Sequence, residues 1–224
     1  FDQWGAEIQR PDYSNSIPEG MTAARVVNNY LEALGGMSKL RELRTYKEIA
    51  KAEMQGMALE VVSHKTNQKQ SLTELKVRGS VMQKQVVNKD YAYLEMQGQK
   101  IDLEGAVFNQ MTTGAAVIPE LNFDFETIEL KGIREIDGKK AYEIKVAEGL
   151  SYFYDTERFL KIQISQTMEL MGSSQTTITK LGAYKEVEGI LFPHQTTLSM
   201  GPQEINFELE LIELNTAIDP QIFK

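Results

Sequence analysis

The sequence predicts a mainly β (α+β) domain, in which a long antiparallel sheet follows one helix and is interrupted by a short helical insert. Three observations support this class. Apolar residues recur at helical spacing over residues 22–34. From Thr45 onward the spacing changes to two, the pattern of strands with one wet face. Turn signals separate these runs at short intervals, so consecutive strands should pair antiparallel.

The helix of residues 22–34 has a clear start and a clear stop. Thr22 is a suitable N-cap, and Gly35-Gly36 can end the helix. A second, shorter helical turn should begin at Ser38. Residues 1–20 carry Pro and Gly among polar residues and are interpreted as a linker or the tail of an upstream domain, which leaves residues 21–224 as the domain itself.

The strands are predicted from alternation and from the turns between them. The run 160–170 is one example, with Ile162 and Ile164 on the buried face and Lys161 on the wet face. Turn pairs such as Asp137-Gly138 give about ten or eleven strands. An antiparallel sheet of this width must curl or close, and the long helix can then plug its concave side.

Two further helical segments are expected. Residues 103–118 lose the alternation and have apolar residues at helical spacing, ending at Pro119. This segment should be a helix or mobile insert between strands. Residues 219–223 should form a final helical turn with Pro220 just inside its start.

Composition argues against several classes of function. The net charge is -8 and the pI about 5.0, which disfavours a nucleic-acid partner. No apolar stretch approaches the roughly 20 residues of a membrane span. The chain has no cysteine, so thiolate chemistry is not available. No cofactor is indicated.

No motif predicts catalysis, and no catalytic, cofactor-binding or metal-binding residue is assigned. The only two histidines are His64 and His194, and both are interpreted as structural or surface residues. Glu60 and His64 lie four residues apart on one strand, a span of roughly 13 Å that one metal cannot bridge. The segment from Gly132 to Lys140 lacks phosphate-loop spacing and should be a hairpin. Gly172-Ser173 should be a hairpin loop.

Methionine is the one unusual component, with ten in the chain. Methionine can line a surface that accepts varied apolar partners, or it can fill gaps in an ordinary core. Composition alone favours the second interpretation, and the first stays open.

The order of several segments resembles a known family. The segments are 21–36, beginning Met-Thr-Ala-Ala-Arg-Val-Val, then 39–43, 81–85, 137–142 and 184–193. Together they resemble LolA-like domains of the outer-membrane lipoprotein-sorting type. More narrowly, they are similar to the version at the C-terminus of insulinase-type zinc peptidases of some Gram-negative bacteria.

The resemblance implies a strongly curved antiparallel half-barrel with helices on its concave side, a non-catalytic role, and the periplasm or cell envelope of a Gram-negative bacterium as the location. The implied partner is an apolar ligand, such as a lipid, an acyl chain or a lipoprotein, with the helix of residues 22–34 as plug or lid. The candidate cavity residues are Met57, Leu59, Val61, Leu94, Met96, Ile162, Ile164, Phe207 and Leu209.

The alternative role is an accessory domain of an upstream zinc peptidase, with the concavity filled by the domain's own side chains. The peptidase motif His-x-x-Glu-His is absent from this sequence, since neither His64 nor His194 is followed by Glu-His.

Overall fold

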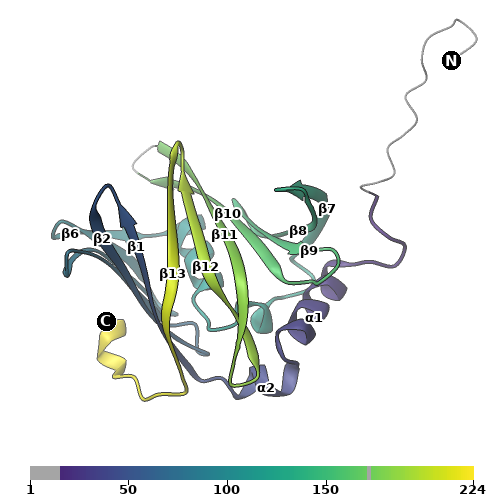
Figure 1. The fold of residues 1–224 in the computed structure, drawn as a ribbon, viewed down its shortest axis with the longest axis horizontal. Coiled ribbons are helices and arrows are strands. Elements are labelled where there is room, and N and C mark those ends of the chain that lie inside the picture. The colour runs from purple at the N-terminus through teal and green to yellow at the C-terminus, as the bar shows by residue number, and fades with distance from the viewer. Residues whose placement is uncertain (1–15, 171–172) are drawn as a thin grey trace, which may run out of the picture.

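The computed structural model describes residues 16–170 and 173–224. They form one antiparallel sheet of thirteen strands in the order β6-β5-β4-β3-β2-β1-β13-β12-β11-β10-β9-β8-β7. The sheet is strongly curved, and the helices lie within its curve (Figure 1). The expected half-barrel class is therefore confirmed.

The strands β1 to β6 form one wing of the sheet. Their bounds are β1 Thr45–Met54, β2 Met57–Thr66, β3 Ser71–Val77, β4 Ser80–Val87, β5 Ala92–Met96 and β6 Gln99–Leu103. The strands β7 to β13 form the other wing. Their bounds are β7 Glu129–Ile136, β8 Lys139–Ala147, β9 Leu150–Asp155, β10 Lys161–Leu170, β11 Ser173–Val187, β12 Ile190–Met200 and β13 Gln203–Leu214. Pairing of β1 with β13 joins the wings.

The helical segments lie near the predicted positions, but the insert expected over residues 103–118 is shorter, because its helix ends at Gly114 and Pro119 begins a separate 3-10 turn. The segments are α1 Ala23–Leu34, α2 Met37–Glu42, α3 Gly105–Gly114 and two 3-10 turns, η2 Pro119–Asn122 and η3 Pro220–Phe223. Thr22 caps α1 by accepting a hydrogen bond from the Arg25 amide. Gly35, at φ 144°, ends the helix so close to β12 that a Cβ there would lie 2.6 Å from the Gly189 carbonyl oxygen.

The number of strands is a correction, since about eleven were expected and thirteen are present. Strand β9 shows why alternation undercounts. Tyr152, Phe153 and Tyr154 are all buried, because both faces of this strand are covered. Such a strand has no wet face and gives no two-residue pattern.

The prediction for the side chain of Lys161 is also wrong. The expected alternation put this lysine on the wet face, but the residue is only 7% exposed. The register between β9 and β10 shifts between Lys161 and Gln163. This bulge turns Lys161 toward the helices, as an extra residue in a strand re-aims its side chains.

Turn predictions succeed where the structure describes the turn. Asp137-Gly138 joins β7 to β8 with φ values of 50° and 77°, as a tight hairpin requires. The loop expected at Gly172-Ser173 lies partly outside the described residues. So does the linker expected over residues 1–20, of which residues 16–20 are described and exposed.

Candidate functional site

The inner face of the sheet is defined by what touches α3. Met111 of α3 packs with Val87, Ala92 and Leu103 of one wing, and Met168 of the other wing joins the same cluster. One helix thus contacts strands that are distant in the sheet order, so these side chains point into the concavity. Side chains alternate along a strand, and each inner residue therefore identifies its neighbours two positions away.

The register extends this face across both wings. One row of directly paired residues crosses six strands: Met96, Gln83, Leu75, Val61, Ala50 and Leu209. On β2, Leu59 and Met57 follow Val61 at alternate positions. Met57, Leu59, Val61, Leu94, Met96, Ile164, Phe207 and Leu209 thus share the inner face with Met168. Ile162 lies at the β10 bulge, where alternation does not fix its side.

These candidates differ in exposure. Leu59 and Phe207 are buried, at 4% and 6% exposed, and Met96 is 43% exposed. The other candidates are half-buried. The wing of β1 to β6 therefore presents an apolar inner face that still meets water.

The opposite end of the concavity is filled by the domain itself. Helix α1 buries Val26, Val27, Tyr30, Leu31 and Leu34 against strands β7 to β12. This is the main core of the protein, and it is continuous with η2 and α2. In Figure 1, α1 and α2 lie at one end of the curved sheet. The concavity thus has a packed end and an open end.

A buried polar cluster lies inside the packed end. Lys161 Nζ is 2.7 Å from Glu120 Oε1, and the Tyr154 hydroxyl donates to the same oxygen over 3.0 Å. Lys161 Nζ also lies 4.4 Å from the ring centroid of Tyr152 and 5.4 Å from that of Tyr30, within cation–π range. The pair is thus enclosed by aromatic rings.

Burial keeps these tyrosines protonated. It raises the pKa of Tyr152, Tyr154 and Tyr30 well above 10.0, and the nearby Glu120 carboxylate raises each pKa further. A tyrosine that stays neutral remains a hydrogen-bond donor. This cluster therefore has the chemistry of a structural network rather than of an acid–base site.

Gln110 ties helix α3 to the second wing. The Gln110 amide nitrogen donates to the carbonyl oxygen of Glu148 over 2.6 Å and to that of Thr167 over 3.0 Å. The Gln166 amide donates to the Gln110 oxygen over 3.1 Å. Besides Gln110, Met111 is the only side chain that α3 buries. This helix is therefore held by a few polar contacts and a small apolar cluster.

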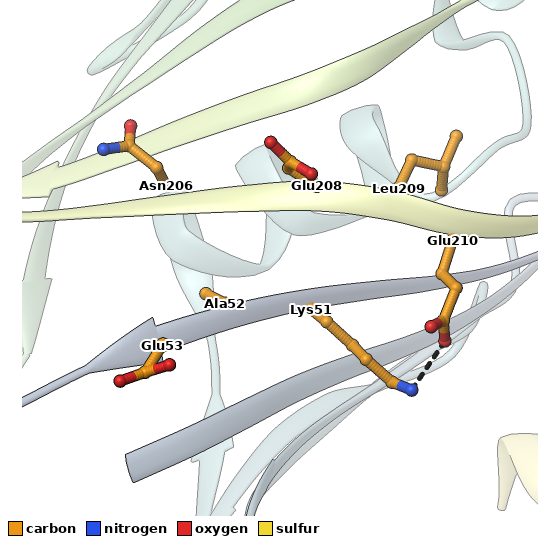
Figure 2. A pocket seen from close by; sticks show the side chains of 7 residues that line it. All are labelled: Lys51, Ala52, Glu53, Asn206, Glu208, Leu209 and Glu210. Carbon is orange, nitrogen blue, oxygen red and sulfur yellow. Dashed lines mark ion pairs between the residues drawn. The ribbon is translucent and has the colours of Figure 1, made fainter. Parts of the chain in front are cut away.

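A hollow of about 400 Å³ lies where β1 and β13 splay apart, and the predicted cavity residue Leu209 is part of its lining. Their pairing ends at Lys51 and Glu208, although β1 continues to Met54. Figure 2 shows the ion pair between Lys51 and Glu210 and the carboxylates of Glu53 and Glu208 around this hollow. Its lining combines these charged side chains with apolar surface that includes Leu209 of the inner face.

The two histidines lie apart from this chemistry. His194 Nδ1 is 3.0 Å from the Phe192 carbonyl oxygen. His64 occupies the outer face of β2, where burial lowers its pKa. No group of three or more His, Asp and Glu side chains suited to a metal occurs within residues 16–170 and 173–224. Within the same ranges, no helix is long and apolar enough to cross a membrane.

Sequence reasoning missed several polar residues that face the concavity, among them Lys65, Glu120 and Lys161. Each resembles an ordinary surface residue in the sequence. The bulge in β10 turns Lys161 inward. Lys65 lies on the same face as Val61 by alternation along β2, and this signal could have identified it. Glu120 follows Pro119, which marks the turn but gives no sign of burial.

The comparisons with known proteins agree with this architecture. No protein-family model matches the sequence, and the curated proteins give no significant match. Among solved structures, a LolA superfamily protein from Nitrosomonas europaea is similar at 11% identity and TM-score 0.55, covering 91% of this chain and 98% of the other. A DUF1329 family protein from Desulfovibrio piger is similar at 8% identity and TM-score 0.54, covering 89% and 95%. The chain therefore has the fold of the LolA superfamily, as its sequence resemblance implied.

Proposed function

We propose that this domain is a non-catalytic carrier or binding module that holds an apolar chain, such as a lipid, an acyl chain or the lipid part of a lipoprotein, on its inner face. The observation that supports this proposal is the row from Met96 to Leu209, which is apolar except for Gln83 and which the domain's own helices leave partly uncovered. Covering such a surface is favourable by about 0.8 kcal/mol for each methylene group buried. An envelope location fits the similarity to LolA-like folds and belongs to the same proposal.

The proposal treats α1 as a fixed plug and not as a lid. Its four buried aliphatic side chains, Val26, Val27, Leu31 and Leu34, contribute roughly 6–12 kcal/mol by area burial. That is comparable to the whole stability of a typical domain, about 5–15 kcal/mol. A ligand that displaced α1 would therefore unfold the protein, and α3 is the element that can yield.

A neutral ligand tests the proposal most directly, because it separates apolar binding from charge. A long-chain monoacylglycerol should bind, and Val61→Trp should weaken its binding by filling the inner face. Ala58→Trp is the matched control, because Ala58 is exposed on the outer face of the same strand. Binding that is absent in the wild type, or equally affected by both variants, would count against the proposal.

A second function is favoured by the packed end of the concavity. There the side chains around α1 fill the concavity and leave no room for a ligand. An accessory domain that binds no ligand would be packed in this way. In that case no acyl ligand binds, and the domain instead associates with a separate protein domain. The association with a zinc peptidase stays a prediction from the resemblance, and co-purification with an upstream peptidase domain would test it.

A further inference from the structure

Lys65 lies on the inner face at the boundary between the two ends of the concavity. It pairs across the sheet with Tyr46 on β1 and Ser71 on β3. The pairing of β2 with both neighbours runs without a bulge, so Lys65 shares the face of Val61 and Leu59. Its side chain is half-buried. A cation is therefore held within the curve of the sheet.

The β2–β3 hairpin is amphipathic along its length on this face. Toward its packed end it presents Lys65 and two buried serines, Ser63 and Ser71. Toward its open end it presents aliphatic side chains, with Val61 on β2 and Leu75 on β3 directly paired. From Lys65 to Met57 the strand spans roughly 27 Å. The face thus has a polar end and an apolar end that are suited to one elongated amphiphile.

The Lys65 ammonium has no hydrogen-bond or ion-pair partner among residues 16–170 and 173–224. The two carboxylates that act on Lys65 each have a partner at one oxygen. Glu48 accepts from the Tyr46 hydroxyl over 2.6 Å, and Glu120 is bonded to Lys161 and Tyr154. Burial is the main cause of the lowered pKa of Lys65, which Glu48 opposes, Lys161 reinforces and Glu120 opposes more weakly. An ammonium in this position gains from any anion that reaches it.

The charged side chains around Lys65 have no net negative charge that would repel an anion. Lys65 and Lys161 balance Glu48 and Glu120, so their sum is zero at neutral pH. Lys161 is committed to Glu120 at 2.7 Å. Lys65 is therefore the charge in this group that remains available for an incoming headgroup.

We infer that Lys65 receives the anionic head of a single-chain amphiphile, a carboxylate or a phosphate monoester, while the alkyl chain lies along Val61, Leu59 and Met57 toward the open end. This inference rests on the proposed binding of an apolar chain and adds the class of headgroup and its orientation. The ammonium donates hydrogen bonds to the anionic oxygens, and such charge-assisted bonds are stronger than neutral ones.

The experiment compares three ligands with the same alkyl chain: palmitate, palmitoyl lysophosphatidate and the neutral monopalmitoylglycerol. Lys65→Met should weaken binding of one or both anionic ligands by roughly tenfold or more and leave the neutral ligand nearly unchanged. Lys65→Arg should retain most of the anion affinity. Lys51→Met is the matched control, because Lys51 is on the outer face and its side chain is 52% exposed.

The outcomes separate this inference from the proposed function. If the neutral ligand binds and Lys65→Met weakens all three ligands equally, or none of them, the headgroup assignment is wrong while the binding module stands. If none of the three ligands binds to the wild-type protein, the proposed function fails, and the headgroup assignment fails with it. If inorganic phosphate binds with the same Lys65 dependence and the acylated ligands do not compete, the site is a free-anion site, and the inferred amphiphile is excluded.

Discussion

Lys161 Nζ and Glu120 Oε1 lie 2.7 Å apart in the interior, where the Glu120 side chain has no exposed surface and the Lys161 side chain is 8% exposed. A charged pair at this depth is costly to create but even more costly to break. The second carboxylate oxygen of Glu120 has no partner among the described residues. Lys161 and Tyr154 therefore provide all the hydrogen bonds that this carboxylate accepts from them.

Lys161→Met should destabilise the protein by about 3–5 kcal/mol, because it leaves the Glu120 charge buried and unpaired. Urea unfolding measures this change. Lys51→Met is the control, since the exposed Lys51–Glu210 pair should contribute at most about 1 kcal/mol. The double variant Lys161→Met, Glu120→Leu should recover much of the loss. Equal effects of the two single lysine variants would show that the buried pair has no special importance.

Alkaline pH should destabilise the fold through the buried tyrosines. Tyr152 and Tyr154 have pKa values raised above their ordinary 10.0 by burial and by Glu120. Below that value both the folded and the unfolded chain keep these protons, and the tyrosines do not make stability depend on pH. Above it the unfolded chain ionises first, so it binds fewer protons and the free energy of unfolding falls as pH rises.

Urea midpoints measured between about pH 9 and pH 11 check this expectation. Lys65 acts in the opposite direction, because burial lowers its pKa, but several buried tyrosines outweigh one lysine. Tyr152→Phe should flatten the alkaline loss by removing one of these groups. A midpoint that stays constant or rises with pH would contradict the assignment.

Gly149→Ala should loosen α3 from the second wing. Gly149 has φ +69°, and a Cβ there would lie 2.5 Å from the Thr167 carbonyl oxygen and 2.7 Å from the Gln110 amide nitrogen. Gly56→Ala is a matched control, with φ +73° and nothing within 4 Å of the added carbon. Because backbone strain is common to both, Gly149→Ala should cost about 1–3 kcal/mol more in unfolding free energy. An equal loss of unfolding free energy in both variants would show that the close contacts of Gly149 do not exclude a side chain.

Hydrogen exchange should distinguish α3 from α1. Helix α1 buries five side chains in the main core, whereas α3 buries Gln110 and Met111. Amides of α3 should therefore exchange through local opening at a lower free energy than those of α1. Met111→Ala should accelerate exchange in α3 alone, and Leu31→Ala should accelerate it throughout the domain. Equal protection of both helices from exchange would show that α3 does not open more easily than α1.

The sequence by itself determined the local structure of this protein. Thr22 and Gly35 bound α1, and Asp137-Gly138 makes a hairpin, because caps and tight turns depend on residues close in the chain. Alternation likewise placed Val61 and its neighbours on one face. Alternation does not identify strand β9, because a strand that is buried on both faces has no alternation of apolar and polar residues.

Only the tertiary structure decided which polar side chains point inward. Lys161 follows the polar positions of its strand in the sequence, yet a bulge turns it into the core toward Glu120, which lies 41 residues away. Lys65 shares the face of Val61 by simple alternation along β2. Only the packing of α3 against the neighbouring strands shows that this face is the concave one. The charges inside the concavity are set by contacts between distant segments, and those contacts form only when the whole sheet closes around its helices.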